Sequence, residues 1–167
     1  MELLRDVAGA VDLPVLHKDF ITSEAQVKAS AEGGASAILL IAALLEPRLL
    51  LELIDAARRW GLESLVEVHC LPEVHAVVGL DVDLIGINNR DIRVFEVDDS
   101  DVGHTELLAG FCGTAKPVIS ESSITGAAEV RRAGRSGADA VLVGTAVMRA
   151  PVIADLLTRM TSVGWPP

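Results

Sequence analysis

Apolar residues along this chain come in short runs, and each run stops at a polar or small residue. The longest run covers residues 35–45 and is too short to span a bilayer, which needs about 20 residues, so it predicts a buried parallel strand and the loop after it. Six runs predict strands, centred on Val15, Ile38, Leu65, Ile85, Val118 and Val141.

Segments with helical character alternate with these runs. The predicted helices cover residues 2–10, 22–33, 48–60, 72–78, 105–111, 125–133 and 151–160. Pro47 stands in the first turn of the third helix, Thr125 is the expected cap of the sixth, and Pro151 is expected to open the last. Residues 91–101 are polar and predict a loop. Strands that alternate with helices predict a parallel sheet in an α/β fold.

Four of the predicted strands end in polar residues that a water-filled barrel mouth could use: Lys18, Glu67, Asn88 and Glu121. Strict alternation along a strand places each of them on the same face as the residue two positions earlier. The same parity groups His69 with Glu67. In a barrel built from βα units, the reactive groups come from the C-terminal ends of several strands. The four side chains are therefore expected to converge.

Five segments carry a family resemblance. They are residues 17–21 (HKDFI), 65–69 (LVEVH), 85–91 (IGINNRD), 120–124 (SESSI) and 140–146 (AVLVGTA). In order and spacing they resemble indole-3-glycerol phosphate synthase, a (β/α)8 TIM barrel of tryptophan biosynthesis. Any one of them is weak evidence, but five in order over about 130 residues make a specific signal.

The chain is shorter than a whole barrel. It has 167 residues, whereas a (β/α)8 barrel needs about 250. In register with the family, its six strands match strands three to eight, so residues 1–167 are expected to form a single incomplete barrel domain that lacks the first two βα units. The family's first strand resembles a Glu-x-Lys segment followed by Ser-Pro-Ser, and nothing here matches it. Two interpretations follow: the chain is a fragment of a longer protein, or it is one piece of a split enzyme.

The resemblance also implies roles for nine residues. These are Lys18 and Glu67 as catalytic groups, Asn88, Glu121 and Ser122 as substrate-binding groups, and Arg90, Ser123, Gly144 and Thr145 at a phosphate site. The implied carboxy-lyase reaction converts 1-(2-carboxyphenylamino)-1-deoxyribulose 5-phosphate to indole-3-glycerol phosphate, carbon dioxide and water. Lys18, desolvated and therefore easier to deprotonate, would act as general acid, and Glu67 would accept a proton in the dehydration. No metal and no organic cofactor is implied.

Each of these residues also has a purely structural interpretation. Lys18 could be a surface side chain paired with Asp19, and Glu67 could form a salt bridge across the barrel. Asn88 could cap its βα turn, and Arg90 could pair with Asp91.

The segment that contains Glu121 and Ser122 could instead be a helix N-terminal cap. Ser123 departs from the family, which usually has Gly there, and its Cβ would crowd a phosphate. His17 replaces a commoner Arg and points away from the lumen by parity. His17 and His69 are expected to play supporting or surface roles.

Composition limits the partners. The net charge of −10 argues against nucleic acid and against an anionic membrane surface, and the absence of Tyr leaves few stacking platforms. A small phosphorylated substrate can still bind locally at glycine-rich turns. Cys70 and Cys112 have no metal-like spacing and suit a reducing compartment, and no secretory signal pattern is visible, so a cytoplasmic location is expected.

Two other functions stay open. A six-unit barrel has two open sheet edges, so the chain could be an inactive fragment, self-associate, or complement a separate N-terminal piece. It could also be a phosphate-binding barrel like phosphoribosylanthranilate isomerase, although the segments with Lys18 and Glu67 match that family less well.

Overall fold

A computed structural model describes residues 1–90 and 101–164 of the chain. Its centre is a six-stranded sheet in which all neighbouring strands run parallel and follow one another in chain order. The strands are β1 (Leu16–His17), β2 (Ala37–Ile41), β3 (Glu63–Val68), β4 (Leu84–Asn88), β5 (Val118–Glu121) and β6 (Ala140–Leu142). The six predicted strands and their parallel arrangement are confirmed.

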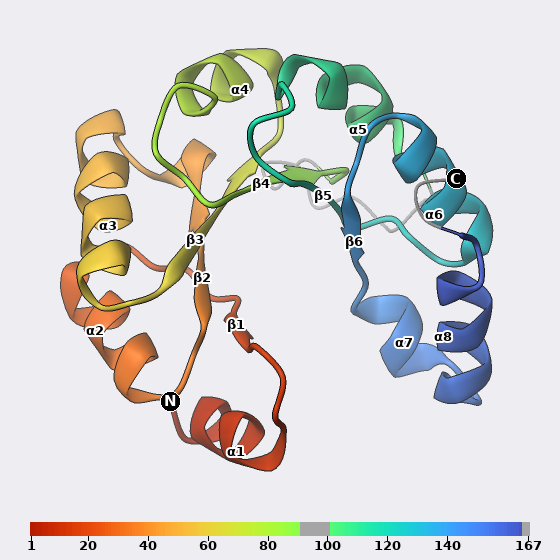
Figure 1. Cartoon of the computed structure of the whole chain (residues 1–167), viewed down its shortest axis with the longest axis horizontal. Coiled ribbons are helices and arrows are strands. Elements are labelled where there is room, and N and C mark those ends of the chain that lie inside the picture. The colour runs from red at the N-terminus through yellow and green to blue at the C-terminus, as the bar shows by residue number, and fades with distance from the viewer. Residues whose placement is uncertain (91–100, 165–167) are drawn as a thin grey trace.

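The sheet curves into an open arc with the helices along its outer side (Figure 1). Within the described residues, β1 and β6 each pair with one neighbour only, so the arc does not close between them. This is a partial (β/α)8 barrel, as expected from the order of strands and helices. In residues 1–90 and 101–164 no helix is long and apolar enough to cross a membrane.

The helices follow the predicted order. They are α1 (Glu2–Ala10), α2 (Glu24–Glu32), α3 (Pro47–Arg59), α4 (Leu71–Val77), α5 (Gly103–Leu108), α6 (Ala127–Arg135), α7 (Thr145–Arg149) and α8 (Ile153–Thr161), with 3-10 turns η1 (Ala42–Leu44) and η2 (Ala109–Phe111). Neither η1 nor α7 was predicted from the sequence. The predicted loop over residues 91–101 lies, apart from Asp101, outside the described residues.

Two predicted helix starts need correction. Gly126, not Thr125, occupies the cap position of α6, and the Thr125 hydroxyl donates instead to Glu129 Oε2 at 3.2 Å. Helix α8 begins two residues after Pro151, with Val152 at the cap position. Ser23 does occupy the cap position of α2, but its hydroxyl bonds to the Gln26 side chain, 3.0 Å away, rather than to a backbone N–H.

The two faces of the sheet bury different residues. On β2, Ile38 and Leu40 belong to the large core between the strands and the helices. Leu39 and Ile41 face the inside of the arc, where they form a smaller cluster with Leu65 of β3. Every residue of β2 is buried, as expected of a strand covered on both faces. The inner cluster fills the floor of the barrel, below the polar ends of the strands.

Candidate active site

Lys18 lies between two buried carboxylates at the C-terminal ends of the strands. Its Nζ is 2.9 Å from Glu67 Oε2 on β3 and 3.0 Å from Glu121 Oε2 on β5. Lys18 itself follows the short strand β1, so the sheet brings together groups 49 and 103 residues apart. Both carboxylate side chains are 1% exposed. The alternative pairing of Lys18 with Asp19 is not observed, since Asp19 lies beside His17 at 3.8 Å.

Asn88 joins this group through both ends of its amide. Its Nδ2 donates to Glu67 Oε1 at 3.0 Å, and its Oδ1 accepts the backbone N–H of Arg90 at 3.0 Å. The second bond closes the turn after β4, so the turn-capping interpretation of Asn88 is also realised. One side chain therefore fixes the start of the loop and orients a carboxylate of the site.

The two carboxylates titrate in opposite directions. Burial raises the pKa of Glu121 to about 7, and the negative charge of Glu67 adds to this effect. Burial alone would raise the pKa of Glu67 as well, but its contacts with His69 and Lys18 outweigh burial and lower that pKa to about 2. Two neighbouring acids with separated pKa values can play different roles in proton transfer.

Lys18 corrects one expectation from the sequence. Burial does act to lower the pKa of its ammonium group, but the negative charges of Glu121 and Glu67 outweigh burial and raise the pKa. Lys18 is therefore harder, not easier, to deprotonate in this site, and it holds its proton at neutral pH. The reason is that the sequence indicates burial at the barrel mouth but not that two carboxylates share one ammonium.

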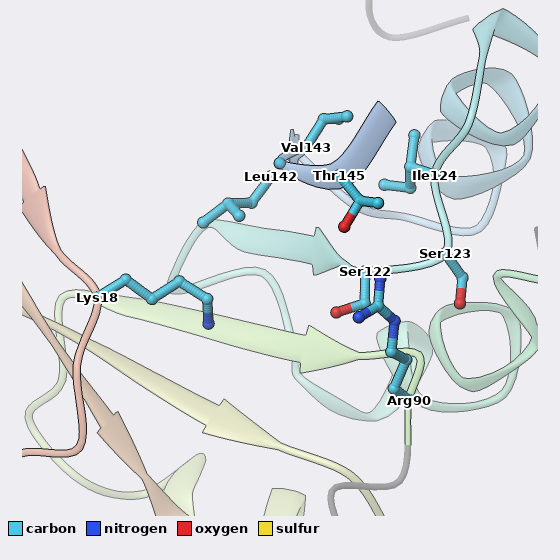
Figure 2. Close-up of a pocket in the computed structure, with 9 residues that line it drawn as sticks. Lys18, Arg90, Ser122, Ser123, Ile124, Leu142, Val143 and Thr145 are labelled. Atoms are coloured by element: carbon cyan, nitrogen blue, oxygen red, sulfur yellow. The ribbon is translucent and has the colours of Figure 1, made fainter. Parts of the chain in front are cut away.

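A polar cavity of about 170 Å³ lies beside this group. It is lined by Lys18, Arg90, Ser122, Ser123, Ile124, Leu142, Val143, Gly144 and Thr145. Arg90, Ser122 and Thr145 bring a guanidinium and two hydroxyls to its wall (Figure 2). All four residues expected at a phosphate site, Arg90, Ser123, Gly144 and Thr145, thus line one cavity, and Lys18 and Ser122 border it too.

The turn after β5 has an unusual backbone. Ser122 and Ser123 have φ angles of 64° and 55°, in the left-handed region that costs a side-chain-bearing residue about 1–2 kcal/mol. A glycine would adopt either conformation freely. This segment does not cap a helix, because α6 begins only at Ala127, so the capping interpretation of Glu121 and Ser122 is wrong.

A buried polar network, not predicted from the sequence, holds this turn in place. Asn89 Nδ2 donates to the backbone carbonyls of Glu121 at 2.9 Å and Ser122 at 3.2 Å, and to Ser120 Oγ at 3.1 Å. Asn89 Oδ1 accepts from the N–H and the hydroxyl of Thr105, both at 3.0 Å. The network ties the end of β4 to β5 and to the start of α5. Its members are apart in sequence, so only the Asn-Asn pair after β4 could have hinted at it.

His69 also lies at the site, although it was not among the site residues expected from the sequence. Its Nε2 lies 3.2 Å from Glu67 Oε1, and both side chains are almost fully buried. In the sequence, only the alternation along residues 65–69 indicated this contact, because it places His69 on the same face as Glu67. His17, by contrast, points outward and contacts Ser30 Oγ of α2 at 2.8 Å, as parity predicted.

A second, less polar cavity of about 240 Å³ is also lined by Lys18. Its walls include the apolar side chains of Phe20, Leu39 and Ile41, and Glu67 and Asn88 border it. Lys18 and Ser122 therefore border both the polar and the less polar cavity. Across residues 1–90 and 101–164, no group of three or more His, Cys, Asp or Glu side chains is arranged to hold a metal ion.

Fold and site together define a (β/α)-barrel protein whose ionisable groups converge at the C-terminal ends of its strands, the arrangement of barrel enzymes. Solved structures agree on the fold. The chain superimposes on 3-hexulose-6-phosphate synthase from Salmonella typhimurium with a TM-score of 0.83 over 97% of this chain and 78% of that one, at 14% identity. At this identity the likeness shows the fold alone.

Sequence comparison is more specific. The family model described as indole-3-glycerol phosphate synthase matches residues 1–160. Proteins named indole-3-glycerol phosphate synthase from Thermococcus kodakarensis and Pyrococcus furiosus are each 44% identical, over 97% and 95% of this chain and 70% and 68% of their own lengths. One from Lachnospira eligens is 38% identical over 97% of this chain and 61% of its own length.

The chain belongs to the indole-3-glycerol phosphate synthase family. The family expected from the five sequence segments is thereby confirmed. So is the class that it implies: a carboxy-lyase enzyme of tryptophan biosynthesis on a TIM-barrel fold.

Proposed function

We propose that this chain carries the acid–base centre of an indole-3-glycerol phosphate synthase. The reaction is ring closure of 1-(2-carboxyphenylamino)-1-deoxyribulose 5-phosphate with loss of carbon dioxide and water. The single observation that carries the proposal is the Lys18 ammonium held 2.9 Å and 3.0 Å from two buried carboxylates, between an apolar and a polar cavity. Family membership supplies the reaction.

Lys18 acts as the general acid. The negative charges of its two partners raise its pKa, so that the ammonium is intact at neutral pH and has a proton to donate to the ketone-derived oxygen. Substrate that enters between the carboxylates and Lys18 takes over part of their contact with the ammonium. That exchange weakens the stabilisation of the charged form and makes the proton easier to transfer.

The two carboxylates have different roles in the reaction. Glu67, with its pKa lowered to about 2, stays ionised and offsets the positive charge that forms as the ring closes. Glu121, with its pKa raised to about 7, is matched to taking up and returning a proton near neutral pH. The proton transfer in the dehydration, expected of Glu67 from the sequence, fits Glu121 better.

Substrate orientation follows from the two cavities. The phosphate lies in the polar cavity, where the Arg90 guanidinium can bind it in bidentate fashion and Ser123, Gly144 and Thr145 line the wall. The aryl ring lies against Phe20, Leu39 and Ile41 in the apolar cavity. Ser122 borders both cavities and Asn88 borders the apolar one, and both hydrogen-bond the ribulose hydroxyls.

The open edges suggest what completes the site. An apolar groove of about 450 Å³ runs beside β6, lined by Val141, Val143, Leu157 and Met160 among others, and one of about 350 Å³ lies beside β1 and α1. An eight-stranded barrel has two more parallel strands at this place. We propose that two βα units pair with β1 and β6 and bury both grooves, and that full turnover needs them.

Turnover assays test the proposal. The purified chain is incubated with the carboxyphenylamino substrate, with and without an added polypeptide that carries two N-terminal βα units of the family, and indole-ring fluorescence is followed. We expect turnover with the added units, and its loss by at least 100-fold in Lys18→Ala. Lys28→Ala, on the exposed face of α2, is the matched control and keeps full activity.

Three other results have distinct meanings. Turnover by the chain alone would show that the two units are dispensable. No turnover under either condition, with a folded chain, would reject the synthase proposal and leave a structural or self-associating partial barrel, which sedimentation velocity would reveal. Turnover of phosphoribosylanthranilate by the same preparation would point to the isomerase instead.

A further inference from the structure

His69 lies in a chain of three buried or half-buried side chains that ends at the active-site carboxylate. Its Nε2 is 3.2 Å from Glu67 Oε1, and its Nδ1 is 3.3 Å from Glu73 Oε2 on α4. The contact with Glu67 is electrostatic, because Nε2 of His69 makes no hydrogen bond in the described part of the chain. Glu73 Oε2 also accepts the backbone N–H of His69 at 2.7 Å. Glu73, in the first turn of α4, thus contacts both the backbone and the ring of His69.

An imidazole with a carboxylate oxygen at each nitrogen favours the doubly protonated form. The neutral ring carries one N–H only, so its other nitrogen would turn a lone pair toward a carboxylate. Burial alone would lower the pKa of His69, but the contacts with Glu67 and Glu73 raise it. Among the described residues, Glu67 from β3 and Glu73 from α4 are the charged groups that face the ring. Lys18 and Glu121 lie beyond Glu67.

An imidazolium at His69 would help to balance the negative charges of the two buried carboxylates. A single ammonium group, that of Lys18, contacts both carboxylates. Burying a carboxylate without a partner costs free energy. Each carboxylate oxygen of Glu67 has its own partners: Oε2 contacts Lys18, whereas Oε1 contacts Asn88 and His69. Glu121 has no second cation of this kind within the described part of the chain, and its pKa is correspondingly high.

We propose that His69, held as an imidazolium by Glu73, is a positioning residue that fixes Glu67 and keeps it ionised. The inference rests on the proposed synthase function, since it assigns to His69 and Glu73 the task of separating the two active-site carboxylates into an ionised and a protonatable one. Loss of either residue would leave Glu67 to compete with Glu121 for Lys18.

Titration by NMR tests the contact without any need for turnover. The imidazole signals of His17, His69, His75 and His104 are recorded from pH 4 to pH 10 on the whole chain, and the His69 signal is assigned by its absence in His69→Gln. We expect the pKa of His69 to fall by more than one unit in Glu73→Gln, where the amide keeps the bond to the backbone N–H but loses the charge. Glu52→Gln, exposed on α3, is the control and leaves it unchanged.

The pH dependence of turnover tests the consequence, with the added βα units present. In Glu73→Gln and His69→Gln, the pKa of Glu67 rises, so kcat falls about tenfold more at pH 5 than at pH 8, while KM changes less than about threefold. A purely structural role would lower activity equally at both pH values. Circular dichroism and thermal unfolding confirm that the variants are folded.

The outcomes separate the two proposals. An unchanged His69 titration in Glu73→Gln, or a pH profile parallel to that of the starting protein, would overturn the role of His69. If the starting protein makes no indole-3-glycerol phosphate but the His69 pKa falls as expected, the synthase proposal fails and the electrostatic contact between Glu73 and His69 stands.

Discussion

Gly86 on β4 leaves the space that the carboxylate of Glu121 on β5 occupies. A Cβ at residue 86 would collide with Glu121 Oε1, because both residues face the inside of the barrel from neighbouring strands. The glycine is therefore a packing requirement of the acid–base centre and not a flexible point in the strand. Its backbone has no positive φ, so space and not conformation explains it.

Gly86→Ala is expected to displace the Glu121 carboxylate from Lys18. The insertion of a methyl group into a filled site destabilises a protein by about 1–3 kcal/mol, and the displaced carboxylate would also lower turnover. Urea unfolding and the turnover assay measure the two effects. Gly79→Ala is the matched control, since a Cβ there meets nothing within 4 Å. Equal stability of the two variants would contradict the packing role of Gly86.

Glu121→Gln is expected to change how stability depends on pH. The folded pKa of Glu121 is raised from 4.5 to about 7, so its contribution is fully present below pH 4.5 and is lost as pH rises through 7. The glutamine variant lacks this loss. Its stability relative to the starting protein should therefore increase from pH 4.5 to pH 7.5, by on the order of 1–3 kcal/mol.

The measurement is urea unfolding at several pH values, with Glu52→Gln on the exposed face of α3 as control. A constant difference between Glu121→Gln and the starting protein over this range would mean that Glu121 titrates as an ordinary surface carboxylate.

Ser123→Gly is expected to tighten phosphate binding. Ser123 has a φ of 55°, where glycine is unstrained, and its Cβ occupies part of the wall of the polar cavity. We expect the Kd of inorganic phosphate, measured by calorimetry, to fall about threefold to tenfold, a gain of about 1 kcal/mol. Ser123→Ala keeps the Cβ and removes only the hydroxyl, so it should show no such gain. If alanine and glycine act alike, the hydroxyl and not the Cβ limits binding.

Asn89→Ala is expected to destabilise the fold by about 2–4 kcal/mol, because it removes the side-chain partner of the buried Thr105 N–H and the amide bonds to the carbonyls of Glu121 and Ser122. Asn89→Asp should be nearly as harmful, since a carboxylate cannot donate to the carbonyls of Glu121 and Ser122. Thr125→Ala, which removes an exposed hydrogen bond, is the control. The measurement is urea unfolding at pH 7. A loss below about 0.5 kcal/mol in both Asn89 variants would show that the network does not hold the turn.

The pattern of residues was enough to determine the number of strands, their parallel order and the face on which Lys18, Glu67, Asn88 and Glu121 lie. Alternation along a strand is a local property, so parity can be read from sequence. Family segments added the cavity residues Arg90, Ser123, Gly144 and Thr145, which the structure gathers at one wall.

Three features of the site depended on the tertiary structure. The sequence does not show that Lys18 contacts two carboxylates at once. Burial acts to lower the pKa of Lys18, but the charges of the two carboxylates outweigh it and raise that pKa, and burial together with the contacts of each carboxylate separates the pKa values of Glu67 and Glu121. Nor does the sequence show the left-handed turn at Ser122 and Ser123.

The contact of His69 with Glu67 is the third such feature. Parity placed the two side chains on one face, but their separation and burial follow from how β3 and α4 pack. Sequence determines which groups face the barrel mouth, because side-chain direction is set locally. Their charge states and contacts are decided by distances between strands, which exist only in the folded sheet.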